Sequence, residues 1–288
     1  LIGTLYPLIL EALQGAQISV GPPFFNFAAM LLMAPLVIAM GFGPLLSWKR
    51  GKLGRASLIL IPALVVSLTA ALIVFWSVLK GPIMTSIGLM LAFWLITSVL
   101  LEISERISLF KNPTGAWSKF KRQPRGDWGM RLAHLGMAVV ILGITVSEAW
   151  THERLIVLSA GETTEVGGYN LLFSDIKPVV GPNYTSVSGT FEVTESGKLV
   201  TILHPESRLY TEPAMTTTEA AIYPMVSGDL YVVIGEQVGP DRWSMRLYFK
   251  PLISGLWFGA ILMMLGGLIS LSDRRLRIGA PLKKEIVP

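Results

Sequence analysis

Long apolar runs recur along the chain and are separated by short polar segments. A helix needs about 20 predominantly apolar residues to cross the hydrocarbon core of a bilayer. The opening run, "LIGTLYPLIL", begins at Leu1 rather than at a methionine, so residues 1–26 predict the end of a transmembrane segment of a longer protein, followed by a periplasmic loop. The later runs predict five transmembrane helices, at about 27–46, 56–79, 83–101, 130–149 and 252–271.

Residues 150–250 show a different pattern, in which polar and apolar positions alternate. Such alternation is typical of strands with one buried face. The turn "ESGK" at 195–198 predicts a hairpin. Several short strands at this spacing bury one face against another sheet, which predicts a sandwich or barrel-like domain. The expected strands lie at 154–159, 169–177, 190–203, 229–236 and 243–249.

Composition agrees with a membrane protein, since 52% of the 288 residues are hydrophobic, 15% are charged and the mean hydropathy is +0.58. We therefore predict an α-helical bundle of about five transmembrane helices with an inserted periplasmic all-β domain. The predicted order is the stub and loop at 1–26, four transmembrane helices at 27–149, the β domain at 150–250, a last helix at 251–272 and a basic tail at 273–288.

Charge predicts the orientation, because Lys and Arg next to membrane spans are retained in the cytoplasm. Basic residues concentrate at 47–55, 102–129 and 273–288, which we place in the cytoplasm. Residues 148–250 hold seven Lys and Arg against 13 Asp and Glu, and we place this part in the periplasm of a bacterial inner membrane. No basic stripe with interleaved aromatic residues is present, so nucleic acid is not an expected partner.

The inventory of chemical groups is short. The chain has no cysteine, which excludes disulfides, thiol nucleophiles and thiolate metal ligands. Among its three histidines, His152 and His204 lie in the β domain without a second ligand at metal-binding spacing, and we interpret both as ordinary surface or turn residues.

His134 is the exception, because it stands inside the apolar run "RLAHLGMAVVILG" at 131–143. About four to six residues separate it from the cytoplasmic boundary, a depth of roughly 6 to 9 Å. One interpretation is an interhelical hydrogen bond or a side chain that reaches the interface. The other is a ligand or proton relay, since ionisable residues at such depth are costly and are usually kept for function. The residues alone leave both open.

Glycine and alanine form a second face of the same expected helix. Gly129, Ala133, Gly136 and Gly143 make a flat strip on which a neighbouring helix can pack closely. Asp127, Met130, His134, Met137, Ile141 and Thr145 share another side.

Several longer stretches resemble the C-terminal part of the CcmF family of cytochrome c biogenesis proteins. They run in the family's order over nearly the whole chain: "GTLYPLI", "ISVGPPFFN", "WGMRLAHLG", "MTTTEAAI", "DLYVVIGE" and "RLYFKPLISGLWFGAILMMLGGL".

This resemblance implies a haem lyase subunit that takes part in joining haem to apocytochrome c, with the haem chaperone CcmE, CcmH and apocytochrome c as partners. It implies that His134 is one axial ligand of a membrane haem b, which reduces the incoming haem with electrons from quinol. The family's tryptophan-rich haem-handling motif and its other ligating histidines do not occur in this chain, so the resemblance implies a missing N-terminal half that completes the site. Alone, the chain is expected to be inactive.

Two alternatives stay open at this level. A paralogue dedicated to nitrite-reductase haem attachment would have nearly the same sequence. A transporter or scaffold subunit without haem would also fit five helices, although apart from His134 the helices carry no acid or base near the membrane midplane.

Overall fold

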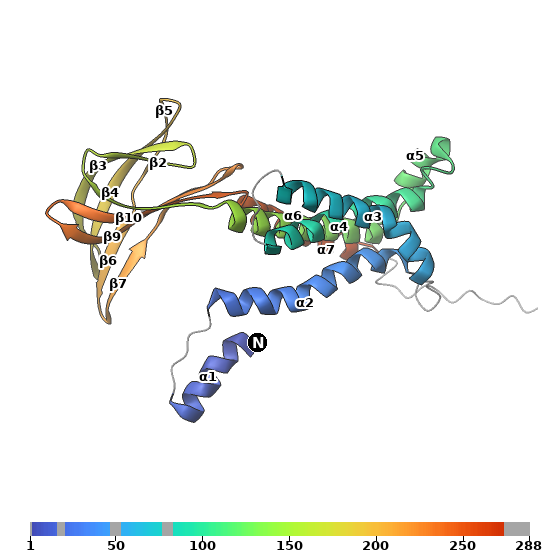
Figure 1. Ribbon diagram of the computed structural model, residues 1–288, viewed down its shortest axis with the longest axis horizontal. Coiled ribbons are helices and arrows are strands. Elements are labelled where there is room, and N and C mark those ends of the chain that lie inside the picture. Colours follow the sequence, from blue (N-terminus) through green and yellow to red (C-terminus); the bar gives the residue numbers. More distant parts are fainter. Residues whose placement is uncertain (1, 16–20, 47–52, 77–82, 274–288) are drawn as a thin grey trace, which may run out of the picture. The chain divides into compact units, whose positions relative to one another are not determined.

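The computed structural model describes residues 2–15, 21–46, 53–76 and 83–273. The chain divides into two compact units, one formed by Leu1–Ala138 with Leu262–Pro288 and the other by Val139–Ile261. Each unit has its own architecture, helical in the first and mainly β in the second (Figure 1).

The helices follow the apolar runs of the sequence. Among the described residues, four helices are long and apolar enough to cross a membrane, namely α3, α4, α6 and α7, and Met30–Leu45 forms a shorter apolar stretch. The prediction of a helical membrane protein is thereby confirmed. The last three residues of the span predicted at 56–79 and residues 274–288 of the predicted tail lie outside the described residues. The helices are α1 Ile2–Gln14, α2 Pro22–Phe42, η1 Gly43–Leu45, α3 Leu53–Val74, α4 Ile83–Ile107, α5 Pro113–Lys121, α6 Arg125–Trp150 and α7 Ser254–Leu271.

Helix α5 is short and has a clear local cause. Asn112 precedes it, and its Oδ1 accepts a hydrogen bond from the backbone N–H of Gly115 at 3.2 Å. Pro113 occupies the first turn, where the missing N–H costs nothing. The sequence analysis did not predict this helix, because nine residues with few apolar positions give no strong periodicity.

The second unit contains a β-sandwich, in agreement with the predicted domain. One sheet has the strand order β1-β10-β9-β8, and the other has β2-β3-β4-β6-β7 with β5 paired to β4. The strands are β1 His152–Ser159, β2 Thr163–Val166, β3 Tyr169–Val180, β4 Tyr184–Glu195, β5 Lys198–Leu203, β6 Glu206–Thr211, β7 Ala214–Glu219, β8 Ala221–Tyr223, β9 Gly228–Gly239 and β10 Arg242–Pro251.

Apolar side chains from both sheets make one core. Phe173 of β3 stacks on Phe191 of β4 with ring centroids 4.9 Å apart, and Leu230 and Leu247 from the other sheet are fully buried in the same cluster. The predicted hairpin is confirmed, since Glu195 pairs with Lys198 across a turn in which Ser196 and Gly197 have φ values of 50° and 79°.

Candidate functional site

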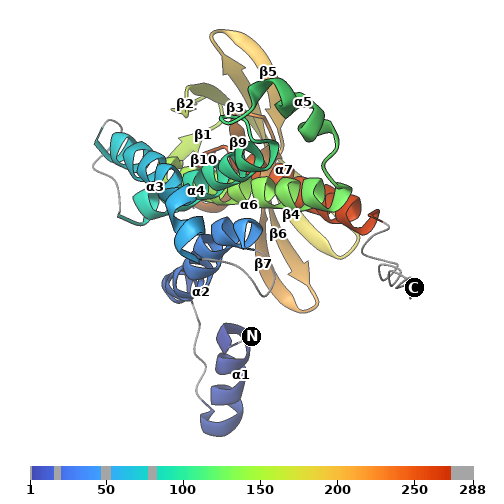
Figure 2. The same ribbon diagram turned by 90° about the vertical axis from the view of Figure 1, so that its right-hand side faces the viewer.

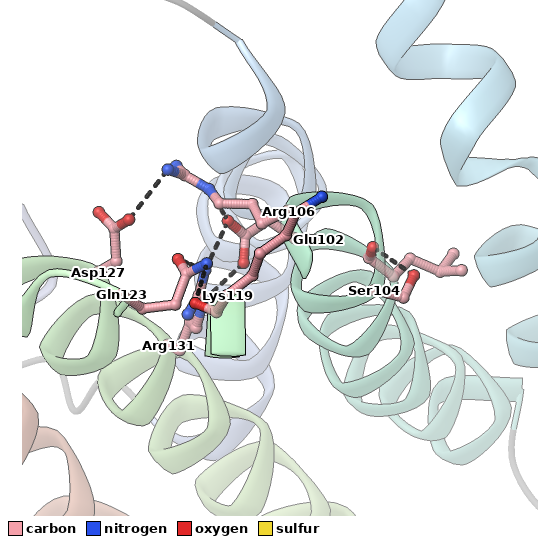
Figure 3. A network of polar contacts seen from close by, with 8 residues as sticks. Glu102, Ser104, Arg106, Lys119, Gln123, Asp127 and Arg131 are labelled. Atoms are coloured by element: carbon pink, nitrogen blue, oxygen red, sulfur yellow. Dashed lines mark hydrogen bonds and ion pairs between the residues drawn. The ribbon is translucent and has the colours of Figure 1, made fainter. Parts of the chain in front are cut away.

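A buried ion pair joins α4 to α6 within the first unit (Figure 3). Glu102 of α4 and Arg131 of α6 are each about 1% exposed. The guanidinium of Arg131 binds the carboxylate at two points, with Nε 2.6 Å from Oε2 and Nη2 3.1 Å from Oε1. Two charges removed from water are stable only when paired and hydrogen-bonded, so this bidentate contact ties the two helices at a defined level.

Further polar groups extend the pair toward the ends of the helices. Arg106 donates from Nε to Glu102 at 2.5 Å, and its Nη1 lies 2.9 Å from Asp127. Gln123 accepts from Nη2 of Arg131 at 3.2 Å. The network therefore takes residues from α4, from the link between α5 and α6, and from the first two turns of α6 (Figure 3).

His134 follows Arg131 by one turn of α6 and is half-buried. Its Nδ1 is buried and has no hydrogen-bond partner among the described residues. The side-chain acceptors of the network belong to Glu102, Gln123 and Asp127, and the network holds the start of α6 without a hydrogen bond to Nδ1 of His134.

The small-residue strip of α6 packs against α7, as the sequence predicted for Gly129 and Ala133. A Cβ at Gly129 would collide with the carbonyl oxygen of Gly266, and a Cβ at Gly266 would come 2.6 Å from the backbone nitrogen of Ala133. The contact therefore requires glycine on both helices. Inside the second unit, Gly143 makes a similar approach to the backbone around Gly255.

The two other histidines lie apart from each other in the β domain. His152 is exposed at the start of β1 and stacks on Phe249, with centroids 6.5 Å apart. His204 is exposed, with Nδ1 3.4 Å from the hydroxyl of Thr190. In the part of the chain that the structure describes, no group of three or more His, Cys, Asp or Glu side chains could hold a metal ion.

Comparison with known proteins decides the family. Residues 149–251 match the family model described as the CcmF C-terminal beta-sandwich. The cytochrome c-type biogenesis protein CycK of Rhizobium meliloti is 43% identical over 98% of this chain and 42% of its own length. The cytochrome c-type biogenesis protein CcmF of Pseudomonas aeruginosa is 38% identical over 96% of the chain and 42% of its own length. The chain corresponds to the C-terminal part of the CcmF proteins.

A solved structure supports this assignment at the level of the fold. The cytochrome c haem lyase CcmF superposes with a TM-score of 0.68 and 25% sequence identity, over 94% of this chain and 42% of the other. This chain thus spans less than half the length of the relatives that it matches. The resemblance seen in the sequence is confirmed, since it holds for both the helices and the β domain.

The ion network is the part of the site that sequence reasoning missed. Glu102 and Arg131 are 29 positions apart. The sequence analysis placed Glu102 in the cytoplasmic segment 102–129 and Arg131 in the span predicted at 130–149, and it did not pair them. One signal in the sequence could have indicated the pair. Glu102 is the first charged residue after the apolar run 83–101, and helix α4 continues through it to Ile107.

Proposed function

We propose that this chain is the C-terminal portion of a cytochrome c haem lyase, and that His134 supplies one axial ligand to a haem b inside the membrane. The observation that carries the proposal is the position of His134, an ionisable side chain that lies half-buried within the apolar, membrane-length helix α6. An ionisable side chain at such depth in a membrane is costly and is usually kept for function.

The residues around His134 fit such a group. Imidazole is a common axial ligand of haem iron, and two imidazoles fill both axial positions, which suits electron transfer. Bound there, the haem supplies one-electron chemistry, with quinol as the proposed donor. The chain's own part is to hold the ring: the Arg131–Glu102 pair fixes α6 one turn before His134, and the contact of Gly129 with Gly266 fixes the adjacent face.

The second axial ligand is proposed to come from the part of the longer protein that this chain does not cover. His152 and His204 belong to the β domain, which we place in the periplasm, and His134 to the cytoplasmic half of a transmembrane helix. In that orientation most of a membrane thickness separates them. Alone, the chain would therefore be inactive in haem attachment.

The β domain is proposed to act as a scaffold or docking unit without a cofactor. His152 and His204 are exposed and lie on different strands or turns, an arrangement that fits a docking role better than a role in holding a metal or a haem. The proposed partners are the remaining N-terminal part of the protein, CcmH, the haem chaperone CcmE and apocytochrome c, at a bacterial inner membrane.

Replacing His134 by alanine tests the proposal. In the full-length protein, His134→Ala should remove the b-type absorption from the purified complex and abolish maturation of cytochrome c, because the iron loses one axial bond. Added imidazole should restore part of both by filling the vacated position. His152→Ala is the matched control and should keep both signals. Full haem content with an unchanged reduced spectrum in His134→Ala would contradict the proposal.

A further inference from the structure

Helix α5 and the turn before it expose large apolar side chains outside the membrane-spanning helices. Phe110 is 81% exposed and Trp117 is 64% exposed. Exposed leucine and phenylalanine side chains on α3 or α7 face lipid in a membrane protein. Helix α5 has nine residues and cannot span a bilayer, so its exposed aromatic side chains need another explanation.

The same segment is strongly basic. Residues 107–126 contain no acidic residue, and none of the basic side chains there forms an ion pair within the described part of the chain. Lys121 lies over the ring of Trp117, with Nζ 4.9 Å from the centroid. Positive charge and exposed aromatic surface therefore occur together. The basic residues are Lys111, Lys119, Lys121, Arg122 and Arg125.

The fold keeps this segment close to a membrane surface. It connects α4, which ends at Ile107, with α6, which begins at Arg125, so it lies at the same end of two spans. Figures 1 and 2 show α5 turned away from the axes of α4 and α6 instead of continuing either helix.

Aromatic contacts fix how α5 is presented. The ring of Phe120 meets Trp128 of α6 edge to face at 4.7 Å and stacks on Trp117 at 5.5 Å. Phe120 thus holds α5 against α6, whereas Trp117, which stacks on the other side of Phe120, stays exposed.

We propose that α5 and its preceding turn form an interfacial anchor that binds the anionic phospholipid surface of the leaflet at this end of the bundle. Trp117 would lie at the boundary between headgroups and acyl chains, where the amphipathic ring of Trp is favoured, and Phe110 would bury its apolar ring beside it. The unpaired Lys and Arg side chains complement the lipid phosphates, which attract basic residues next to a membrane span. Charge complementarity favours an anionic lipid surface as the binding partner, because the segment carries five cations and no acidic residue.

The absence of cysteine from this chain allows a direct test by spin labelling. Cysteine replaces Phe110, Trp117 or Ser118 one at a time, and the labelled chain is placed in nanodiscs with or without phosphatidylglycerol. Collision with oxygen reports lipid, and collision with a nickel chelate reports water. Labels at 110 and 117 should favour oxygen several-fold in anionic discs, while the exposed position 118 should favour nickel.

A second arm tests the charges. Lys111→Gln combined with Arg122→Gln should reduce the difference between anionic and neutral discs at position 117, because both exposed cations are lost. Lys198→Gln with Arg242→Gln removes two exposed cations from the β domain and should leave the difference unchanged. Nickel access at all three labels would overturn the proposal, and so would shielding of 110 and 117 from both reagents, which would indicate a covering protein surface.

Discussion

At the scale of single residues, Glu102 and Arg131 are the most deeply buried charged side chains in the described part of the helical unit. Arg131→Met should lower the free energy of unfolding by about 3 kcal/mol, because it leaves the Glu102 carboxylate in a dry interior with Arg106 as its remaining cation. Thermal unfolding in detergent measures the change. The double variant Glu102→Gln with Arg131→Met strands no charge and should be less destabilised than the single one. Equal losses would show that burial of the charge is not what matters.

Asp229 gives a residue-scale prediction for the β domain. Burial raises the pKa of its carboxyl, and the hydrogen bond from the backbone N–H of Met225 opposes this only in part. The folded domain therefore binds more protons at this site than the unfolded chain does. Stability from this group is present below the unfolded pKa and is lost as pH rises toward the folded pKa.

The variant Asp229→Asn removes that dependence. We expect it to unfold at a higher denaturant concentration than the native domain at neutral pH, and the advantage should shrink as the pH is lowered through the acidic range. Denaturant titration of residues 149–251 at several pH values measures this difference. If the native domain became more stable relative to Asp229→Asn as the pH rose, the assigned upward direction of the pKa shift of Asp229 would be contradicted.

At the scale of elements, the α7 side of the α6–α7 contact depends on Gly266 and tolerates a side chain at the neighbouring Gly267. A Cβ at Gly266 meets the backbone of Gly129 and Ala133, whereas a Cβ at Gly267 has no heavy atom within 4 Å. Gly266→Ala should destabilise the bundle by about 1–3 kcal/mol through overpacking. Gly267→Ala is the matched control and should be neutral or slightly stabilising, because alanine favours helix. Thermal unfolding of both variants decides, and equal behaviour would refute the close contact.

The elements also show what the sequence could predict. Spans such as 83–101 and strands such as 243–249 follow from apolar runs and alternation, which are local patterns. Helix α5 depends on the Asn112 cap and on the contact of Phe120 with Trp128, and neither gives a periodic signal. The Glu102–Arg131 pair arises only when two spans pack side by side. His134 could be singled out because an ionisable residue in an apolar run is conspicuous, but its unpartnered Nδ1 required the fold.

At the scale of the whole molecule, the orientation in the membrane remains a prediction that charge alone makes. The basic segment 102–129 reaches into the first turn of α6, and the acidic residues 148–250 begin in its last turn, so this one span separates the two. Retention of Lys and Arg in the cytoplasm then places α5 inside and the β-sandwich in the periplasm. The interfacial anchor proposed for α5 would face the cytoplasmic leaflet.

Single cysteines test this orientation, since the chain has no native thiol. Ser196 lies exposed in the β4–β5 turn, and Ser118 lies exposed on α5. In spheroplasts, a maleimide that cannot cross membranes should label Ser196→Cys directly and Ser118→Cys only after permeabilisation. Both positions are exposed, so the difference reports the side of the membrane and not burial. Labelling of Ser118→Cys before permeabilisation, with Ser196→Cys protected, would invert the topology and move His134 to the periplasmic half of the bilayer.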